Sequence, residues 1–360
     1  MTMGGVSLCS SNSTTRRRVA STIKMLNALV VRDRARLTDV VTIPQAAARI
    51  DDGDVGLVTG QRLTVRELLD LMLVPSANDA AEALAIHIGG SEKAYVALMN
   101  AKAKSLGLAN TIAADAHGLG KREYSTAHDL SVIARRFMAD PVLRAIVAKR
   151  TVKVPQVKGP AVVVASTDRL LGAYRGIEGV KTGFTSPAGY CFVGAAKRGD
   201  VELVGVVLGA ASVNARFAEM RKLLDWGFAH AHTRRIVSAA TTIGVNPVGL
   251  ALRRRLLVHP IRSVSVTLLD GSPAPTERLT IGTLRLPLRA GQQVGTVSVF
   301  QGKQLLANVP LAVLVDVPAP ASQAWLPVED APWYAFLGPV FDFLDRLAPG
   351  AAQARTTSGQ

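Results

Sequence analysis

The stretch Val74-Pro75-Ser76-Ala77-Asn78-Asp79-Ala80-Ala81 decides the interpretation of this chain, because it lies between two other short motifs. Residues 21–24 read Ser-Thr-Ile-Lys, the only S-x-x-K in the sequence, and residues 181–183 are its only Lys-Thr-Gly. The S-x-N pattern of Ser76 and Asn78 occurs three times, so the motif alone carries no weight. Its position between the other two selects residues 76–78 as the relevant copy.

Ser21 and Lys24 are three residues apart, so on a helix the amine can reach the hydroxyl. A serine hydroxyl needs a base to become a nucleophile. A lysine can be that base only when burial or a nearby cation lowers its pKa. We therefore expect Ser21 as nucleophile and Lys24 as general base, with Lys181 as the nearby cation. Ser76 is the expected proton relay to the leaving amine, and Asn78 is expected to hold the substrate amide and orient Lys24.

Lys181, Thr182 and Gly183 are predicted to bind substrate from a strand at a sheet edge, where a peptide can lie as an added strand. A side chain at Gly183 would obstruct a close approach of main chain. The main-chain N–H groups of Ser21 and Phe184 are the expected donors to an oxyanion.

The hydrophobic pattern changes twice along the chain. Helical spacing and cap residues dominate residues 21–147, and strands and turns follow from residue 151. A hairpin is predicted at residues 190–208, and Ser212 is predicted to cap a helix that runs to Trp226. This order predicts an α+β fold in which helices pack on an antiparallel sheet. Four short strands then predict a small all-β domain, at residues 264–268, 284–288, 294–300 and 311–315.

Composition excludes several classes of protein. The chain has 360 residues, of which 48% are hydrophobic, which is enough for two domains with cores. The net charge of +15 suits an anionic neighbour, but no nucleic-acid recognition element accompanies the arginine runs at residues 16–18 and 253–255. Cys9 and Cys191 lack the surroundings of a metal site. We expect no cofactor, no metal and no nucleic acid.

The sequence around these motifs resembles the serine-type D-alanyl-D-alanine carboxypeptidases, which are low-molecular-mass penicillin-binding proteins of peptidase S11 type. The resemblance runs continuously over about residues 19–229 and includes Ala20–Leu29, the stretch at residues 74–81, His117-Gly118-Leu119, and Gly179–Thr185. The motif set is one that penicillin-binding proteins share with class A β-lactamases. The β-rich segment and the final amphipathic stretch are similar to the family's second domain and membrane anchor.

The resemblance implies the penicillin-binding, β-lactamase-like transpeptidase fold and an activity. The activity is removal of the terminal D-Ala from peptidoglycan stem peptides ending in D-Ala-D-Ala, through an acyl-enzyme on Ser21 that β-lactams also form. Arg216 matches a family arginine that binds the terminal carboxylate, which suits its forked donor. The histidines His117 and His128 fall in structural stretches of the family pattern, so we expect hydrogen-bonding roles for them. The implied location is the cell envelope, at the outer face of the cytoplasmic membrane.

We divide the chain accordingly: residues 1–20 form a polar leader, 21–230 the catalytic domain, 231–318 the β-rich domain, 319–332 a linker, 333–348 an amphipathic segment with membrane-surface contact, and 349–360 a tail. The leader lacks the apolar core of a secretory signal, and no stretch is long and apolar enough to span a bilayer.

Two departures from the family pattern leave alternatives open. The family has further β-strands before the nucleophile, and without them we expect an exposed sheet edge. The family's Asn-Thr-Asn reads Ser166-Thr167-Asp168 here, and Asp168 adds a negative charge near a site for a carboxylate. A β-lactamase-like hydrolase is one alternative, although no clear glutamate motif for deacylation lies between Ser76 and Lys181. A non-catalytic protein that binds anionic cell-wall polymers is the other.

Overall fold

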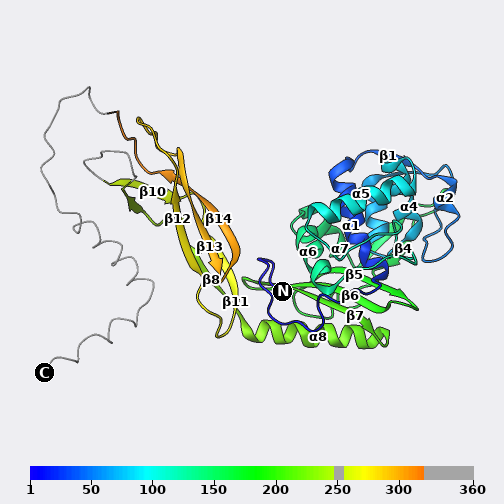
Figure 1. Ribbon diagram of the computed structural model, residues 1–360. Helices are drawn as coiled ribbons and strands as arrows, with labels where there is room; N and C mark the ends of the chain where they lie inside the picture. The colour runs from blue at the N-terminus through cyan, green and yellow to red at the C-terminus, as the bar shows by residue number, and fades with distance from the viewer. Residues whose placement is uncertain (247–254, 320–360) are drawn as a thin grey trace, which may run out of the picture.

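Helix α1 (Lys24–Arg34) is the centre of the first half of the molecule. Its residues from Lys24 to Val31 are all buried, and apart from Lys24 and Asn27 they are apolar. A helix that is apolar all round must be covered all round. Helices α3 (Val65–Leu73), α4 (Asn78–Gly89), α5 (Glu92–Ser105) and α6 (Ala127–Met138) supply that cover. Figure 1 shows α4, α5 and α6 beside α1 in the computed structural model, which describes residues 1–246 and 255–319.

The elements of this helical half follow one another closely. They are η1 (Ala20–Ile23), α1, β1 (Val40–Thr42), α2 (Gln45–Ala48), β2 (Arg62–Thr64), α3 (Val65–Leu73), α4 (Asn78–Gly89), α5 (Glu92–Ser105), α6 (Ala127–Met138), α7 (Pro141–Val147), β3 (Thr151–Val154) and β4 (Val162–Ala165). The strands β1 and β2 pair antiparallel, as do β3 and β4.

Cap residues set where several helices begin. Thr64 and Glu67 form a capping box at α3, in which each side chain bonds the main chain of the other. Ser91 caps α5, and Ser212 caps α8 (Val213–His230) as the sequence predicts. Helix α8 runs four residues past Trp226, because Gly227 continues the helix against the Leu203 side chain.

The central sheet is a three-stranded antiparallel meander. Its strands are β5 (Ile177–Thr185), β6 (Gly189–Arg198) and β7 (Val201–Ala210), in the order β5-β6-β7, which confirms the predicted hairpin. Alternate side chains face opposite sides of a sheet. Val193 and Val204 join the helical core on one side, whereas Phe192 and Leu203 pack with α8 on the other. The predicted α+β class with helices on an antiparallel sheet is therefore confirmed.

The first residues of the chain are part of the fold, which differs from the polar leader expected there. The main chain of Met1 and Met3 bonds with Val204 and Glu202 at the outer edge of β7. Val6 and Leu8 are buried in the core that α8 shares with the β-rich domain. The edge expected to be exposed is thus partly covered, because a short extended segment satisfies its N–H and C=O groups.

The β-rich domain follows α8 directly and extends away from the helical half (Figure 1). A five-stranded sheet has the order β12-β13-β14-β10-β9, and a two-stranded sheet pairs β11 with β8. The bounds are β8 (Ala231–Val237), β9 (Ile243–Val245), β10 (Leu256–Pro260), β11 (Val264–Leu269), β12 (Thr276–Ile281), β13 (Gln293–Gln301) and β14 (Gln304–Val313).

One strand predicted in this domain is wrong. Residues 284–288 form no regular strand, and only Leu288 makes an isolated bridge, to Val317. Pro287 interrupts the segment, because proline has no N–H to give to a ladder. The linker beyond residue 319, the amphipathic segment 333–348, the tail 349–360 and Arg253-Arg254 lie outside the described residues. Within the residues that are described, no helix is long and apolar enough to cross a bilayer.

Candidate active site

Lys24 lies at the centre of a group of polar side chains contributed by four segments. It begins α1 and is fully buried. Its Nζ donates to Ser21 Oγ at 3.1 Å, to the Ser76 carbonyl at 2.7 Å and to Ser76 Oγ at 3.3 Å. Asn78 Oδ1 is a further acceptor, so the three hydrogens of the ammonium group are shared among four acceptor atoms. The first two predicted motifs therefore meet at one amine, although they are more than fifty residues apart in the sequence.

Burial lowers the pKa of Lys24 to about 7, since the ammonium ion loses its hydration. Carboxylates oppose the shift, with Asp115 and Glu123 giving the largest effects, followed by Asp79 and Asp52. A lysine with a pKa near 7 is neutral in a large fraction of molecules at neutral pH. The free amine can then accept a proton, as a general base must.

Ser21 is half-buried in η1, between Lys24 and the segment before α6. Its Oγ donates to the main-chain carbonyl of His117 at 3.2 Å. Gly118 lies directly against the same turn, because a Cβ on it would be 2.4 Å from the Ala20 carbonyl carbon. The tight contact leaves no room for a side chain, so the 117–118 main chain fixes the position of the nucleophile's turn.

Ser76 and Asn78 are positioned by the turn between α3 and α4. Ser76 has a φ of +73°, a left-handed conformation that costs a non-glycine residue about 1–3 kcal/mol and that gathers at functional sites. Asn78 begins α4, its N–H donates to the Gly53 carbonyl, and its side-chain amide donates to the Asp52 carbonyl. The loop between α2 and β2 therefore holds the Asn78 amide with its oxygen toward Lys24.

The Lys181-Thr182-Gly183 motif lies on β5, at an edge of the central sheet as predicted. Lys181 is fully buried and donates to the Thr182 carbonyl at 3.0 Å. Burial lowers its pKa well below the usual range, and the charges of Lys24 and Arg216 lower it further. The charge of Lys24 thus acts on Lys181, whereas the lowered pKa of Lys24 comes from burial and not from Lys181, which differs from the expected role of Lys181 as the nearby cation. Thr182 Oγ1 donates to Thr167 Oγ1 at 2.7 Å.

Gly183 brings β5 against the turn that carries Ser21. A Cβ on Gly183 would lie 3.0 Å from both the Ser21 nitrogen and the Val19 oxygen. The close approach predicted at this glycine is therefore made by the chain's own main chain. It puts the Ser21 N–H beside the end of β5, where Phe184 follows. The Phe184 ring is half-exposed and stacks on Tyr190, with 4.2 Å between ring centroids.

Arg216 reaches this end of β5 from α8. It is buried, its Nη1 donates to the Gly183 carbonyl at 3.2 Å, and its Nε has no partner among the described residues. Asp168 is buried nearby, and desolvation raises the pKa of its carboxyl to about 6 although Arg216 and Lys181 oppose the shift. Asp168 therefore adds a titratable negative charge beside two of the predicted substrate-binding cations.

The structure brings together every site residue that the sequence singled out. Ser21, Lys24, Ser76 and Asn78 share one hydrogen-bond network, and the residues from β5 and α8 border it. Sequence reasoning missed the main-chain carbonyl of His117 and the loop around Asp52. No residue-type signal could have identified either, because both act through main-chain oxygens.

Comparison with known proteins agrees with this geometry. Residues 2–212 match the family Peptidase_S11, D-alanyl-D-alanine carboxypeptidase. The chain is 28% identical to D-alanyl-D-alanine carboxypeptidase DacF of Bacillus subtilis, over 87% of this chain and 83% of that protein. It is 31% identical to DacC of Escherichia coli, over 83% of this chain and 78% of that one.

Solved structures give the same result. Penicillin binding protein 5 from Haemophilus influenzae superposes with a TM-score of 0.70 at 28% identity, over 87% of this chain and 94% of that one. The match extends through the β-rich domain as well as the helical half. The family match covers more than half of the chain and includes all three motifs. We conclude that this chain belongs to the peptidase S11 family of D-alanyl-D-alanine carboxypeptidases, with a fold like that of penicillin-binding protein 5.

Proposed function

We propose that this chain is a serine D-alanyl-D-alanine carboxypeptidase that removes the terminal D-Ala from peptidoglycan stem peptides. The observation that carries the proposal is the contact between Lys24 Nζ and Ser21 Oγ, at 3.1 Å, with the lysine fully buried and its pKa lowered to about 7. A base matched to neutral pH and within hydrogen-bond reach of a serine is the requirement for forming an acyl-enzyme.

Acylation follows from these contacts. Ser21 Oγ attacks the carbonyl carbon of the penultimate D-Ala, and its proton passes to the neutral Lys24 amine. Ser76 Oγ lies 3.3 Å from Nζ and relays a proton to the leaving nitrogen. The C–N bond breaks, free D-Ala leaves, and the peptide remains as an ester on Ser21. Water then hydrolyses the ester and restores the serine.

Substrate binding uses the other side of the site. The N–H groups of Ser21 and Phe184 would stabilise the oxyanion of the tetrahedral intermediate. Arg216, Lys181 and Thr182 would bind the terminal carboxylate, with the arginine fork as the main anchor. The peptide would lie along β5, which pairs with no strand on its outer side among the described residues.

The same serine would be acylated by β-lactams, which makes them inhibitors. The substrate polymer lies outside the cytoplasmic membrane, so we assign the work of this protein to the cell envelope. Contact with the membrane surface through residues 333–348 is part of the proposal. It rests on the amphipathic sequence pattern alone, since those residues lie outside the described ranges.

Labelling with a fluorescent penicillin tests the proposal. The wild-type chain should form a covalent adduct and release D-Ala from a peptide ending in D-Ala-D-Ala. Ser21→Ala should do neither while keeping the wild-type circular dichroism spectrum. Ser105→Ala is the matched control, because it removes an exposed serine hydroxyl of α5 and should label normally.

Three results would point elsewhere. Rapid turnover of the β-lactam, without D-Ala release, would favour the β-lactamase-like alternative. A folded wild-type chain that takes no label and binds cell walls in a salt-sensitive way would favour the non-catalytic alternative. Labelling that persists in Ser21→Ala would show that Ser21 is not the nucleophile.

A further inference from the structure

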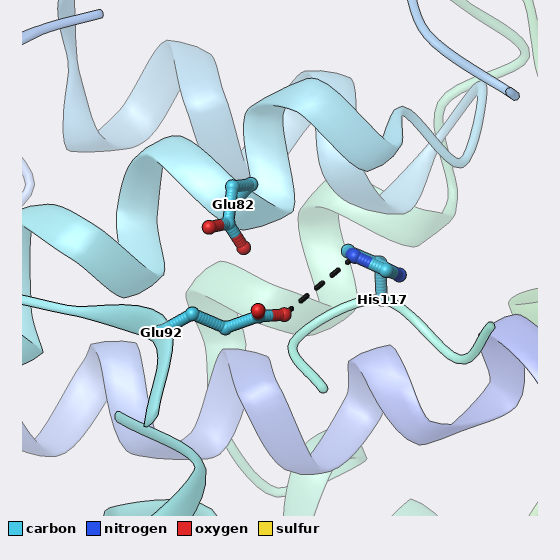
Figure 2. A group of neighbouring side chains, drawn as sticks. All are labelled: Glu82, Glu92 and His117. Atoms are coloured by element: carbon cyan, nitrogen blue, oxygen red, sulfur yellow. Dashed lines mark ion pairs between the residues drawn. The ribbon is translucent and has the colours of Figure 1, made fainter. Parts of the chain in front are cut away.

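Glu82, Glu92 and His117 form a cluster next to the proposed nucleophile, and the proposed mechanism does not use their side chains. Glu82 is in the middle of α4, Glu92 begins α5, and His117 is in the segment before α6. One ligand atom from each lies within 4.8 Å of the others. Figure 2 shows the three side chains converging from three separate segments, with His117 Nε2 3.7 Å from Glu92 Oε1.

Glu82 is the residue in this cluster that calls for an explanation. It is 94% buried, from its exposed fraction of 6%. Its Oε2 is inaccessible and has no hydrogen-bond partner among the described residues. Leaving a charged oxygen buried without a partner is costly, so such groups are paired, protonated or bound to a cation. Burial, followed by the neighbouring carboxylates of Glu92 and Asp115, raises the pKa of Glu82 to about 7.

His117 directs one ring nitrogen toward the two glutamates. Its Nε2 faces Glu92, whereas its Nδ1 lies 3.3 Å from Asp115 Oδ2 on the far side of the ring. Asp115 is itself fixed, because it accepts from the N–H groups of His117, Gly118 and Leu119. Nδ1 is buried and makes no hydrogen bond among the described residues, so Asp115 lies close to the ring without fixing its tautomer. Nε2 is the ring nitrogen that faces the carboxylate of Glu92.

We propose that Glu82, Glu92 and His117 bind one divalent transition metal ion, of which zinc is the best match. Two carboxylates and a neutral imidazole balance the charge of a divalent ion. An imidazole ligand favours zinc and its neighbours over magnesium and calcium, which prefer oxygen ligands only. Ligand atoms 2.0–2.2 Å from a tetrahedral zinc are about 3.3–3.6 Å apart, so side chains whose ligand atoms now lie within 4.8 Å of one another would move together by up to about 1.5 Å. Glu92 is partly exposed and provides the entry path.

The proposed ion would join three segments, two of which are already linked by a hydrogen bond from the Ala116 N–H to Glu92 Oε1 at 3.3 Å. It would tie the middle of α4 to the start of α5 and to the turn at His117. The carbonyl of His117 accepts the Ser21 hydroxyl, and Gly118 packs on the Ala20 carbonyl. The role we assign is therefore structural: the ion fixes the main chain that supports the nucleophile. The spacing of residues 82, 92 and 117 matches no ligand motif, which is why the sequence predicted no metal.

A proton shared between Glu82 and Glu92 is the competing explanation for the buried carboxylates. The following experiment distinguishes a bound metal ion from a shared proton. The full-length protein is freed of metal with EDTA, dialysed and titrated with zinc chloride by calorimetry. We expect one saturable site per chain. Zinc at about 100-fold above its dissociation constant should raise Tm by roughly 5–10 °C. Glu82→Gln should fold, because its amide can donate to Glu92, and should lose the site and the Tm shift.

Two further variants complete the test. Loss of a group that only hydrogen-bonds a metal ligand weakens metal binding by roughly 10- to 100-fold. Glu92→Gln alters a ligand itself, the most exposed of the three, so it should weaken zinc binding by more than that. His87→Gln removes an exposed imidazole from the same helix and should leave binding unchanged. The proposal is overturned if wild-type protein binds no zinc at this stoichiometry, or if Glu82→Gln binds zinc as tightly as wild type. If wild-type protein binds no zinc, the carboxyl groups of Glu82 and Glu92 share a proton instead of a metal ion.

Discussion

Ser21 Oγ donates its hydrogen bond to the main-chain carbonyl of His117, not to the base beside it. Lys24 Nζ donates to the same Oγ, so in this state the serine proton points away from the lysine. Proton transfer requires a neutral amine and a rotation of the hydroxyl from His117 toward Nζ. The protonation state of Lys24 therefore controls whether the nucleophile can be activated.

The rate of acylation by penicillin should rise with pH through about 7. Below that pH the Lys24 amine is protonated and cannot accept, so the rate should fall about tenfold per pH unit, as for a single titrating base. Above it the rate should level off. Stopped-flow labelling between pH 5 and 9 measures the profile. A flat profile would mean that Lys24 is not the base.

Replacing Lys24 by methionine should nearly abolish that acylation. Loss of a general base costs about 10²- to 10⁴-fold in rate. Methionine keeps much of the volume, so the helix should stay packed, although Asn78 Oδ1 and the Ser76 carbonyl lose a donor. The unfolding curve should be recorded beside the labelling rate. A folded variant that labels at the wild-type rate would contradict the assignment.

Asp168→Asn should improve binding of a peptide carboxylate above pH 6. Desolvation raises the pKa of Asp168 to about 6, so the side chain is neutral below that pH and negative above it. Above pH 6 its negative charge repels a substrate carboxylate near Lys181 and Arg216. We expect this repulsion to raise KM by about tenfold. Wild-type KM for D-Ala-D-Ala peptides should therefore increase as pH rises through 6, whereas the KM of Asp168→Asn should not. Equal pH dependence in both proteins would exclude this effect.

Gly118→Ala should damage the nucleophile turn. Gly118 has a φ of +103°, and an added Cβ would meet the carbonyl of Ala20. We expect a loss of about 3 kcal/mol in unfolding free energy and slower acylation. Gly107→Ala is the control, since it has a φ of +74° with nothing within 4 Å of the new Cβ. Gly107→Ala should lower the free energy of unfolding by only about 1–2 kcal/mol, and the variant should be labelled by penicillin at the normal rate. The same loss of labelling in both variants would assign the effect to backbone strain alone.

Thr64→Ala should reduce stability without altering chemistry. Thr64 caps α3 and shares a capping box with Glu67, and loss of such a cap costs about 1 kcal/mol. Urea unfolding measures the change. The acylation rate of the folded fraction should equal that of wild type, because α3 contributes no side chain to the network around Lys24. A reduced rate would show that α3 transmits strain to Ser76.

Several features of this protein follow from residue spacing and cap residues along the chain, without any information on packing. The S-x-x-K spacing sets Ser21 and Lys24 on one face of a helical turn, and alternation in residues 190–208 sets the hairpin. The caps at Ser91 and Ser212 act within one turn of helix, so sequence alone reveals them. At residues 284–288, in contrast, the run of leucines predicts a strand that does not form, because Pro287 cannot donate to a ladder.

Only the tertiary structure decided what surrounds those residues. Burial of Lys24 lowers its pKa, and burial is a property of the whole packed core. The contact of Ser21 with the His117 carbonyl involves a main-chain oxygen, which carries no residue-type signal. The convergence of Glu82, Glu92 and His117 depends on how two helices and a turn pack. Sequence spacing specifies neighbours along a helix or strand, whereas distances between segments are set by how their surfaces fit together.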